Sequence, residues 1–333
     1  MVKYPIPTGY LFVDDYSKGK LETLSIGDYG KEYNVKADFL GYKKDVMGVP
    51  NVECMPLSEK WVVTLSTQYG CVMKCKFCDV PNVKMRGNAS FNDLGRQLDS
   101  ALGLFDVSYT ERLNIHFARM GEPIFNENVF DFSIWLYDNK SDLPLRVEVL
   151  HPVLTTSLPK AFKKLEERIL RWCGIKNQVY NGQAGLQFSI NTTDEQARSY
   201  MFTDMQLNLK DFSKIAAKMP DPVSRKYCLN FAYDPKYGVD AKLLSSMFDS
   251  DKFMCKVTPI HNNDACRDAG MNTPGGYDSW TPYKDVYDGL GEYFDVLAFV
   301  PSMDEEEGLV TCGNLVLGGG KLQSNDVIKI KGL

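Results

Sequence analysis

The stretch "WVVTLSTQYGCVMKCKFCDVP", Trp61 to Pro81, determines how the rest of the chain is interpreted. Its first seven residues are rich in β-branched side chains, which is typical of a strand buried in a parallel sheet. Three cysteines follow at once, Cys71, Cys75 and Cys78. Gly70 stands at the entrance of this loop and permits a tight backbone turn. The stretch therefore predicts a strand followed by a loop that presents three thiols.

Strands and helices alternate along the chain after this point, about six times. Such alternation predicts an α/β fold with a parallel sheet and outer helices. We expect a partial (β/α)6 TIM-like barrel, with its chemistry at the carboxyl ends of the strands. The expected strands are 61–67, 112–120, 145–157, 184–193, 226–234, 253–261 and 295–302. The expected helices are 91–105, 126–139, 158–173, 209–219, 241–248 and 281–294, the first with Asn92 as a candidate cap.

The chain is expected to have three parts. Residues 1–58 form a short N-terminal β-rich extension, with strand-like runs at 10–15, 20–26 and 36–42. Residues 59–300 form the barrel core. Residues 301–333 form a C-terminal segment that carries Cys312 and a glycine-punctuated tail, which we expect to be mobile.

Composition is that of a globular protein: 333 residues, 44% of them hydrophobic and 24% charged. Because the chain has neither an apolar run of about eighteen residues nor an apolar signal core, we expect no membrane span and a cytoplasmic location. The cytosol keeps thiols reduced, so the nine cysteines are potential thiolates. The net charge of −5 offers no overall attraction for a nucleic-acid backbone. A local basic patch or a solvated face is formed by Lys74, Lys76, Lys84 and Arg86.

Three thiols in one loop can hold metal in two ways. Structural zinc takes four protein ligands, so a fourth would have to come from elsewhere, for example Cys54 or a distant histidine. Iron–sulfur clusters are also held by thiolates. A [4Fe–4S] cluster held by Cys71, Cys75 and Cys78 would leave one iron open, and an open metal position is a reactive one.

The Cys-x-x-x-Cys-x-x-Cys pattern after a first strand, with Phe77 before the third cysteine, resembles the radical S-adenosylmethionine superfamily. That resemblance implies two cofactors, a [4Fe–4S] cluster and S-adenosylmethionine, which is cleaved to a 5′-deoxyadenosyl radical. Gly121 and Glu122, in "MGEPIFN", are similar to the superfamily segment that meets the amino group of S-adenosylmethionine. A carboxylate suits an ammonium group, and glycine permits close approach.

A narrower resemblance runs from about residue 56 to residue 320. The chain is similar to RlmN/Cfr-type enzymes, which methylate ring carbons of an adenine in ribosomal RNA. The segments that carry the likeness are "STQYGCVMKCKFC", "MGEPIFN", "LTTSLP", "FSINTTDEQAR", "KVTPIHN" and "EEEGLVTCGNL". Carried over by position, the resemblance implies that Glu122, Thr155, Ser189, Asn191 and Asn262 contact S-adenosylmethionine. It also implies that Cys312 is the cysteine that carries the methyl group.

The chain departs from this family at one catalytic position. The family has a second catalytic cysteine seven residues before the first cluster cysteine, and Thr64 stands there. A hydroxyl is too weakly acidic to replace a thiolate. A family glutamate is matched by Asn51, with Glu53 two residues on, and Cys54 is a candidate substitute thiol. We expect the other cysteines to be core residues: Cys54, Cys173, Cys228, Cys255 and Cys266.

Three hypotheses follow. The first is a radical S-adenosylmethionine methyltransferase that works through Cys312 on a nucleic acid or nucleotide base, with an external electron donor such as flavodoxin or ferredoxin. The second keeps the radical chemistry without methyl transfer, on a peptide, nucleotide or small metabolite. The third is a metal-binding or redox module that is not an enzyme. The sequence does not name the substrate, the modified atom or the oligomeric state.

Overall fold

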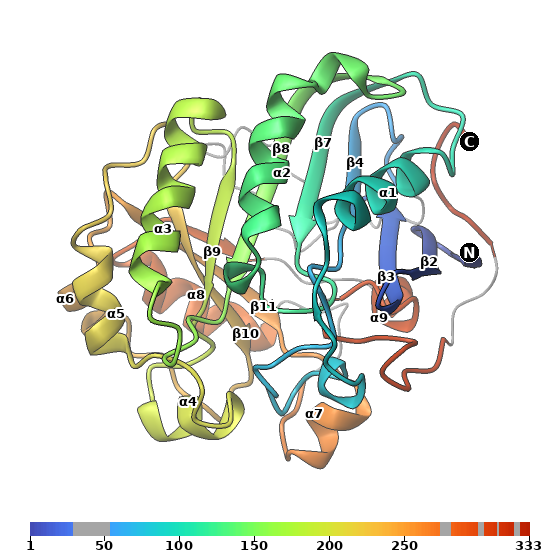
Figure 1. Ribbon diagram of the computed structural model, residues 1–333. Coiled ribbons are helices and arrows are strands. Elements are labelled where there is room, and N and C mark those ends of the chain that lie inside the picture. The colour runs from blue at the N-terminus through green and yellow to red at the C-terminus, as the bar shows by residue number, and fades with distance from the viewer. Residues whose placement is uncertain (29–53, 274–280, 299–302, 312, 323–326) are drawn as a thin grey trace.

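A computed structural model describes residues 1–28, 54–273, 281–298, 303–311, 313–322 and 327–333. One curved sheet runs through it, with helices packed on its outer side (Figure 1). The N-terminus and the C-terminus lie on the same side of the molecule (Figure 1). Predicted strand 36–42, together with Asn51, Glu53 and Cys312, lies outside the described residues.

Ten strands of the described chain form this sheet, in the order β1-β2-β3-β4-β7-β8-β9-β10-β11-β12. From β4 onward every neighbouring pair is parallel, which confirms the α/β class and the mostly parallel sheet. The described part of the sheet has seven parallel strands, and each corresponds to one of the seven strands expected from residue 61 onward. The strands are β1 (Val2–Ile6), β2 (Gly9–Tyr16), β3 (Gly19–Ile26), β4 (Lys60–Thr64), β7 (Tyr109–Phe117), β8 (Arg146–Thr156), β9 (Gly185–Ser189), β10 (Tyr227–Tyr233), β11 (Phe253–Pro259) and β12 (Val296–Ala298). A separate small ribbon pairs β5 (Gln68–Tyr69) with β6 (Gly87–Asn88).

Strand β4 shows how side chains divide between the two faces of the sheet. Trp61 and Val63 are fully buried in the main core between the sheet and the helices. Val62 and Thr64 point to the other face, where they line an interior cavity. Because successive side chains of a strand alternate in direction, one short run supplies both the core and the cavity wall.

The helices follow the expected alternation, with several short additions. Helices α1, α2 and α3 lie side by side over one region of the sheet (Figure 1). The α-helices are α1 (Phe91–Leu102), α2 (Glu127–Asp138), α3 (Leu165–Gly174), α4 (Glu195–Met201), α5 (Leu209–Ala216), α6 (Ala241–Met247), α7 (Asp264–Asp268), α8 (Lys284–Gly291) and α9 (Met303–Glu307). The short turns are η2 (Val80–Asn82), η3 (Pro123–Phe125), η4 (Lys140–Asp142), the π-helical η5 (Ile175–Val179) and η6 (Thr281–Tyr283). None of the helices in the described ranges is long and apolar enough to cross a membrane.

The cap of α1 differs from the prediction. Ser90, not Asn92, is the N-cap: its hydroxyl accepts from the Asp93 amide, and the Asp93 carboxylate accepts from the Ser90 amide. Ser90 has the extended backbone that an N-cap requires, whereas Asn92 already lies within the helix. The reciprocal pair is a capping box, which satisfies two amides that the helix leaves open.

The N-terminal strands extend the barrel sheet. Strands β1 to β3 form an antiparallel meander, and β3 pairs antiparallel with β4 through Leu24 and Thr64. Strand β1 was not expected from the sequence. Phe12 and Leu21 pack in the same core cluster as Trp61 of the barrel. The division of the chain at residue 58 remains a prediction.

The described end of the chain is held in place, contrary to the expected mobile tail. Ile330 forms a parallel bridge with Cys54 and is 7% exposed. The Lys329 amide donates to the Pro7 carbonyl at 2.8 Å, and the Lys331 amide donates to the Cys54 carbonyl at 2.9 Å. These bonds join the last described residues to the first strands.

Candidate active site

A cavity of about 400 Å³ lies on the inner face of the sheet. Its wall includes residues from the ends of β4, β7, β8, β9, β10 and β11, the edge at which a βα-barrel carries its chemistry. In Figure 1 this edge faces α4, α7 and the loop that follows β5. The predicted site residues among its lining are Cys71, Cys75, Cys78, Gly121, Glu122, Thr155, Ser189 and Asn191.

The cysteine loop begins with a forced backbone conformation. Gly70 has φ +84°, and a Cβ added there would lie 2.8 Å from the Val83 carbonyl oxygen and 2.9 Å from Met85 backbone atoms. An L side chain would therefore collide with the backbone of residues 83–85, so glycine is required at this turn. The turn directs Cys71, Cys75 and Cys78 toward the cavity.

The far side of the loop is docked on the end of α4. The Lys76 amide donates to the Met201 carbonyl at 2.9 Å, and the Thr203 hydroxyl donates to the Met73 carbonyl at 3.1 Å. Phe77 meets Phe202 edge to face, with ring centroids 5.3 Å apart. Phe77 therefore anchors the loop by packing, which gives the aromatic residue before the third cysteine a structural role.

Glu122 is a buried carboxylate in the cavity wall. It is 3% exposed, and its two oxygens accept from the Ile124 amide at 3.2 Å and from the Ser157 amide at 2.7 Å. Burial is the main cause that raises its pKa to about 7, partly opposed by these hydrogen bonds. Gly121 precedes it with φ +98°, and a Cβ there would lie 2.5 Å from Gln68. A cation placed against Glu122 would restore its charged form.

The turn after β9 carries Ser189 and Asn191. The Asn191 backbone is left-handed, with φ +64°, and its side-chain oxygen accepts from the Ala232 amide at 3.1 Å. Its side-chain nitrogen finds no partner among the described residues, although Asn191 is 1% exposed and lines the cavity. A buried donor without a partner is costly, and a ligand acceptor in the cavity would satisfy it.

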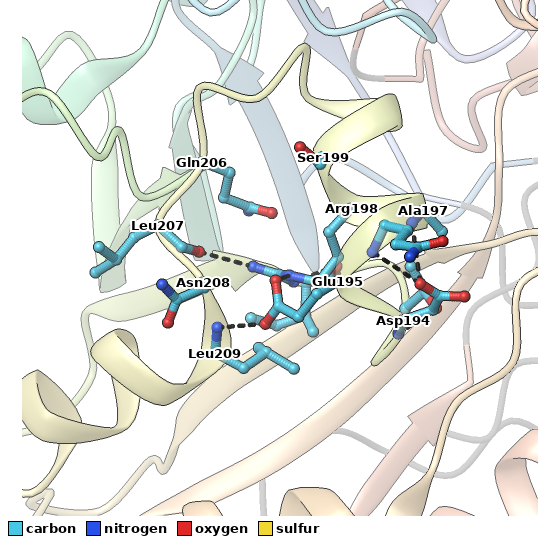
Figure 2. A network of polar contacts seen from close by, with 12 residues as sticks. Asp194, Glu195, Ala197, Arg198, Ser199, Gln206, Leu207, Asn208 and Leu209 are labelled. Carbon is cyan, nitrogen blue, oxygen red and sulfur yellow. Dashed lines mark hydrogen bonds and ion pairs between the residues drawn. The ribbon is translucent and has the colours of Figure 1, made fainter.

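A network of polar contacts around the buried Arg198 side chain supports this turn (Figure 2). Arg198 donates to the Ile190 carbonyl at 2.6 Å and to the Leu207 carbonyl at 3.1 Å, and it pairs with Glu195 at 3.4 Å. Glu195 in turn accepts from the Leu209 amide at 2.6 Å. Figure 2 shows Arg198 lying between these groups. The network fixes the residue immediately before Asn191.

Two other predicted residues have different outcomes. Thr155 is the second-last residue of β8 and lines the cavity, as does Thr64 at the end of β4. Asn262 does not belong to the cavity lining: its side chain is exposed, and its side-chain oxygen accepts from Arg267 at 3.1 Å. Its buried neighbour Asn263 faces inward, because its amide group donates to the Phe77 and Gly313 carbonyls.

The chain on both sides of residue 312 reaches the cavity. Thr311 and Gly313 line it, although Cys312 itself lies outside the described residues. Gly313 has φ +90°, and a Cβ there would lie 3.4 Å from the Cys78 sulfur. The Asp79 amide donates to the Gly313 carbonyl at 2.7 Å. The C-terminal segment is therefore packed against the cysteine loop.

The remaining cysteines are buried, as expected for core residues. Burial raises the pKa of Cys173 to about 11, and the pKa values of Cys228 and Cys266 to about 12. Cys54 is fully buried beside Ile330, with its sulfur 3.9 Å from the Pro7 carbonyl oxygen. It does not line the described cavity, so the geometry gives no support to Cys54 as a substitute for the missing family cysteine.

Residues deeper in the cavity were not singled out from the sequence. His116 lies on β7, and burial, with the nearby charges of Lys256 and Lys60, lowers its pKa to about 3. His151 lies on β8, and burial together with Arg225 also lowers its pKa. Both imidazoles are therefore neutral near neutral pH. Their place on the cavity wall could have been found from strand alternation, since His116 lies one residue before the end of β7 and His151 lies five residues before the end of β8.

Gln68 was also missed. Its side-chain oxygen accepts from the Glu122 amide at 2.9 Å, and its side-chain nitrogen donates to Asn88 at 2.8 Å. Gln68 thereby fixes the turn that carries Glu122. No spacing rule joins residues 54 positions apart, so the sequence held no signal for this contact.

These residues fit a thiolate-held cluster and a nucleoside-sized ligand. Within the described residues, no three His, Cys, Asp or Glu side chains lie close enough to share one metal ion. Two thiolates on one zinc ion are at most about 4.6 Å apart, because each bond is about 2.3 Å long. A cluster does not require such convergence, since each thiolate binds a different iron. The buried carboxylate of Glu122 and the open donor of Asn191 suit a ligand with an ammonium group and polar acceptors.

The fold is similar to that of a solved radical SAM methyltransferase. A solved radical SAM methyltransferase from Sphaerobacter thermophilus superposes with a TM-score of 0.60, covering 91% of this chain and 76% of that chain at 14% identity. No family model matches the chain.

Similar proteins found by sequence comparison are described as RlmN RNA methyltransferases, which confirms the resemblance to RlmN. A probable dual-specificity RNA methyltransferase RlmN from Prochlorococcus marinus (strain MIT 9515) is 25% identical over 221 residues, 64% of this chain and 59% of that protein. The dual-specificity RNA methyltransferase RlmN of Aliarcobacter butzleri is 26% identical over 176 residues, 53% of this chain and 45% of that protein. The chain thus spans less than two thirds of the length of these relatives.

Proposed function

We propose that the protein is a radical S-adenosylmethionine enzyme whose [4Fe–4S] cluster is held by Cys71, Cys75 and Cys78. The observation that carries this proposal is the meeting of the three cysteines with Glu122 and Asn191 in one cavity at the carboxyl edge of a parallel sheet. The residues come from three separate parts of the sequence. A structural thiol loop would not need a buried carboxylate and an open amide donor beside it.

The residues around the cluster bind and orient S-adenosylmethionine. Glu122 accepts the ammonium group, and Gly121 lets the ligand approach the backbone. Asn191 donates to an acceptor of the ligand, while Ser189 and Thr155 offer hydroxyls on the same wall. A cluster held by these cysteines would supply the electron for reductive cleavage of S-adenosylmethionine. The enclosing strands would exclude water from the reacting groups.

The reaction that the site supports best is methylation of a nucleic-acid or nucleotide base, with Cys312 carrying the methyl group. The neighbours of Cys312, Thr311 and Gly313, both line the cavity next to Cys78. Relatives described as dual-specificity RNA methyltransferases support the same chemistry and an RNA substrate. Lys74, Lys84 and Arg86 are exposed on the loop beside the cavity, where phosphates could bind.

Oxygen-free reconstitution tests the radical chemistry. We expect iron and sulfide to bind in equal amounts and reductant to cause release of 5′-deoxyadenosine. Alanine at Cys71, Cys75 or Cys78 should abolish both, whereas Cys173→Ala, a matched buried cysteine outside the site, should abolish neither. Zinc bound in place of iron, without any cleavage of S-adenosylmethionine, would instead support a metal-binding module.

Mass spectrometry of the peptide that contains Cys312 tests methyl transfer. Protein supplied with S-adenosylmethionine should gain the mass of one methylene group on Cys312. The Cys312→Ala variant should keep 5′-deoxyadenosine formation and lose base methylation. RNA from cells with and without the protein, compared by nucleoside analysis, would then show which base is modified.

A radical reaction without methyl transfer is the second candidate. The observation that favours it is Thr64, which lines the cavity where RlmN/Cfr-type enzymes place a catalytic cysteine. A hydroxyl cannot take the part of a thiolate in releasing a product bound to Cys312. Unmodified Cys312 together with active cleavage of S-adenosylmethionine would select this candidate.

The proposed cluster needs an electron donor. An electron must come from outside the protein, so we propose a flavodoxin or a ferredoxin as the donor. Thiolate ligands require a reducing compartment, which is consistent with a cytoplasmic location.

A further inference from the structure

A fully buried ion pair joins the N-terminal meander to the turn after β7. Glu22 lies on β3 and Arg119 follows β7, and both side chains are completely shielded from solvent. Two guanidinium nitrogens of Arg119, Nε at 3.1 Å and Nη2, donate to one oxygen of Glu22. The Arg119 amide donates to the Leu65 carbonyl at 3.1 Å, which fixes the arginine backbone at the end of β4.

The remaining polar atoms of this pair bind the C-terminal segment. The third guanidinium nitrogen of Arg119, Nη1, donates to the Thr311 carbonyl at 3.2 Å. The second oxygen of Glu22 accepts from the Leu317 amide at 3.1 Å. One ion pair therefore binds the segment twice, at residues on either side of position 312.

A second set of contacts holds the residues between those two points. The Asp79 amide and the Asn263 side chain both donate to the Gly313 carbonyl, at 2.7 and 3.3 Å. Leu315 is fully buried against Val80 and Met120, with Cys71 and Cys78 packed beside them. The ion pair binds Thr311 and Leu317 at the two ends of the segment. The cysteine loop contacts Gly313 and Leu315 between them.

We propose that the Glu22–Arg119 ion pair is a positioning device that holds the residues on both sides of position 312 against the cluster loop. The proposal rests on the function proposed above, since it concerns the delivery of the Cys312 thiol. A buried ion pair is by itself weak evidence for stability, so the hydrogen bonds that this pair makes to the segment carry the argument. The atoms of Arg119 and Glu22 that do not bond to each other form hydrogen bonds with one segment, residues 311–317. That segment contains Cys312, the proposed methyl carrier.

Hydrogen exchange in the cluster-free protein tests the proposal without any activity. Glu22→Met combined with Arg119→Met removes both bonds to the segment and leaves no unpaired buried charge. We expect the Leu317 amide to exchange at least about tenfold faster, because it loses its acceptor. Alkylation of the Cys312 thiol, followed at the peptide level, should accelerate in the same variant.

The control is Arg168→Met, which removes another buried arginine, ion-paired with Glu127 on the outer helices. It should leave exchange at residues 311–317 unchanged. Equal exchange of Leu317 in the double variant and the wild type would overturn the proposal. So would a uniform acceleration over all strands, which would indicate a purely structural role.

The loaded enzyme gives a second readout. In the double variant, 5′-deoxyadenosine formation should persist while methylated product per cleaved S-adenosylmethionine falls at least about tenfold. Equal loss of both products would contradict a positioning role. If the wild-type protein never cleaves S-adenosylmethionine, the proposed function fails, yet exchange and alkylation still decide whether the ion pair holds the segment.

Discussion

At the scale of single residues, burial shifts the pKa values of titratable side chains in the cavity wall. Glu122 is a carboxylate enclosed by the sheet, and its pKa is raised to about 7. His116 is an imidazole in the same cavity, with a pKa lowered to about 3. In both groups burial is the first cause, and it disfavours the charged form. A cation bound against Glu122 would lower its pKa again and favour the charged carboxylate.

The pH dependence of stability should reveal the raised pKa of Glu122. Its folded-state pKa of about 7 exceeds its ordinary value of 4.5, so the folded protein holds this proton more tightly than the unfolded chain. Stability from this group is therefore lost as pH rises from about 4.5 to 7, by about 3 kcal/mol at 1.36 kcal/mol per pKa unit. Thermal unfolding of Glu122→Gln apoprotein should depend less on pH across that window.

The matched control for this measurement is Glu167→Gln, which changes an exposed carboxylate on α3. It should retain the wild-type dependence on pH. Asp79, with a pKa that burial raises to about 6, will leave some slope in every variant. Identical slopes in Glu122→Gln and the wild type would show that the Glu122 carboxyl titrates normally.

At the scale of elements, the sequence predicted the strands and helices where a long hydrophobic pattern existed. The strands of the barrel, from β4 onward, and the helices α1, α2, α3, α5, α6 and α8 overlap the predicted ranges. Strand β4 and strand β7 begin one and three residues before their predicted ranges, and α3 ends one residue after its range. Helices α7 and α9 have five residues each, too few to show a helical period, and α4, with seven residues, was also not predicted. Helix α3 begins at Leu165 rather than near residue 158, because Leu158 has φ +56° and Pro159 bridges to Gln206.

The site followed from the same strand-end logic, within limits. Cys71, Glu122 and Asn191 could be placed together because parallel strands end at one edge of a sheet. The bonds of Gln68 to Glu122 and of Arg119 to Glu22 could not. They join residues far apart in sequence, through side-chain geometry that no periodicity encodes.

The cap of α1 can be tested by substituting alanine for Ser90 and, separately, for Asn92. Ser90→Ala removes the capping hydroxyl and should lower the free energy of unfolding by about 1 kcal/mol, within a range of about 0.5 to 2. Asn92→Ala, at the exposed position that the sequence suggested, should change it little. Urea unfolding of the two variants distinguishes these positions, and a larger loss for Asn92→Ala would contradict the observed capping box.

At the scale of the whole molecule, one sheet passes from β1 to β12 without interruption in the described chain. Phe12, Leu21, Trp61 and Ile330 belong to a single core cluster. The N-terminal meander and the barrel therefore share both backbone pairing and apolar contacts. Elements joined in this way are expected to unfold together.

Native-state hydrogen exchange should confirm this shared unfolding. The most protected amides of β2 and of β7 should report the same opening free energy. Ile330→Ala, which empties a buried position at the junction, should lower both values equally. A meander that opens at much lower free energy than β7 would instead support an independent unit ending near residue 58.

Charge reversal on the cysteine loop tests whether RNA binds at this face. Lys74→Glu combined with Lys84→Glu should weaken RNA binding and reduce the slope of log affinity against log salt by about 1.4 to 1.8, if each lysine neutralises one phosphate. Lys210→Glu with Lys242→Glu changes two exposed lysines on the outer helices and should leave the slope unchanged. Equal slopes for both pairs would place the RNA elsewhere.

The contact between Gly318 and Asp79 has a consequence for how the protein matures. A Cβ at Gly318 would lie 2.5 Å from the Asp79 carbonyl oxygen, so the two backbones touch directly above the cysteine loop. Under the proposed function, a cluster would have to be inserted at these cysteines either before the segment packs against the loop or while the segment is displaced from it. Metal offered during synthesis in the cell should therefore be incorporated faster than metal added to the finished apoprotein.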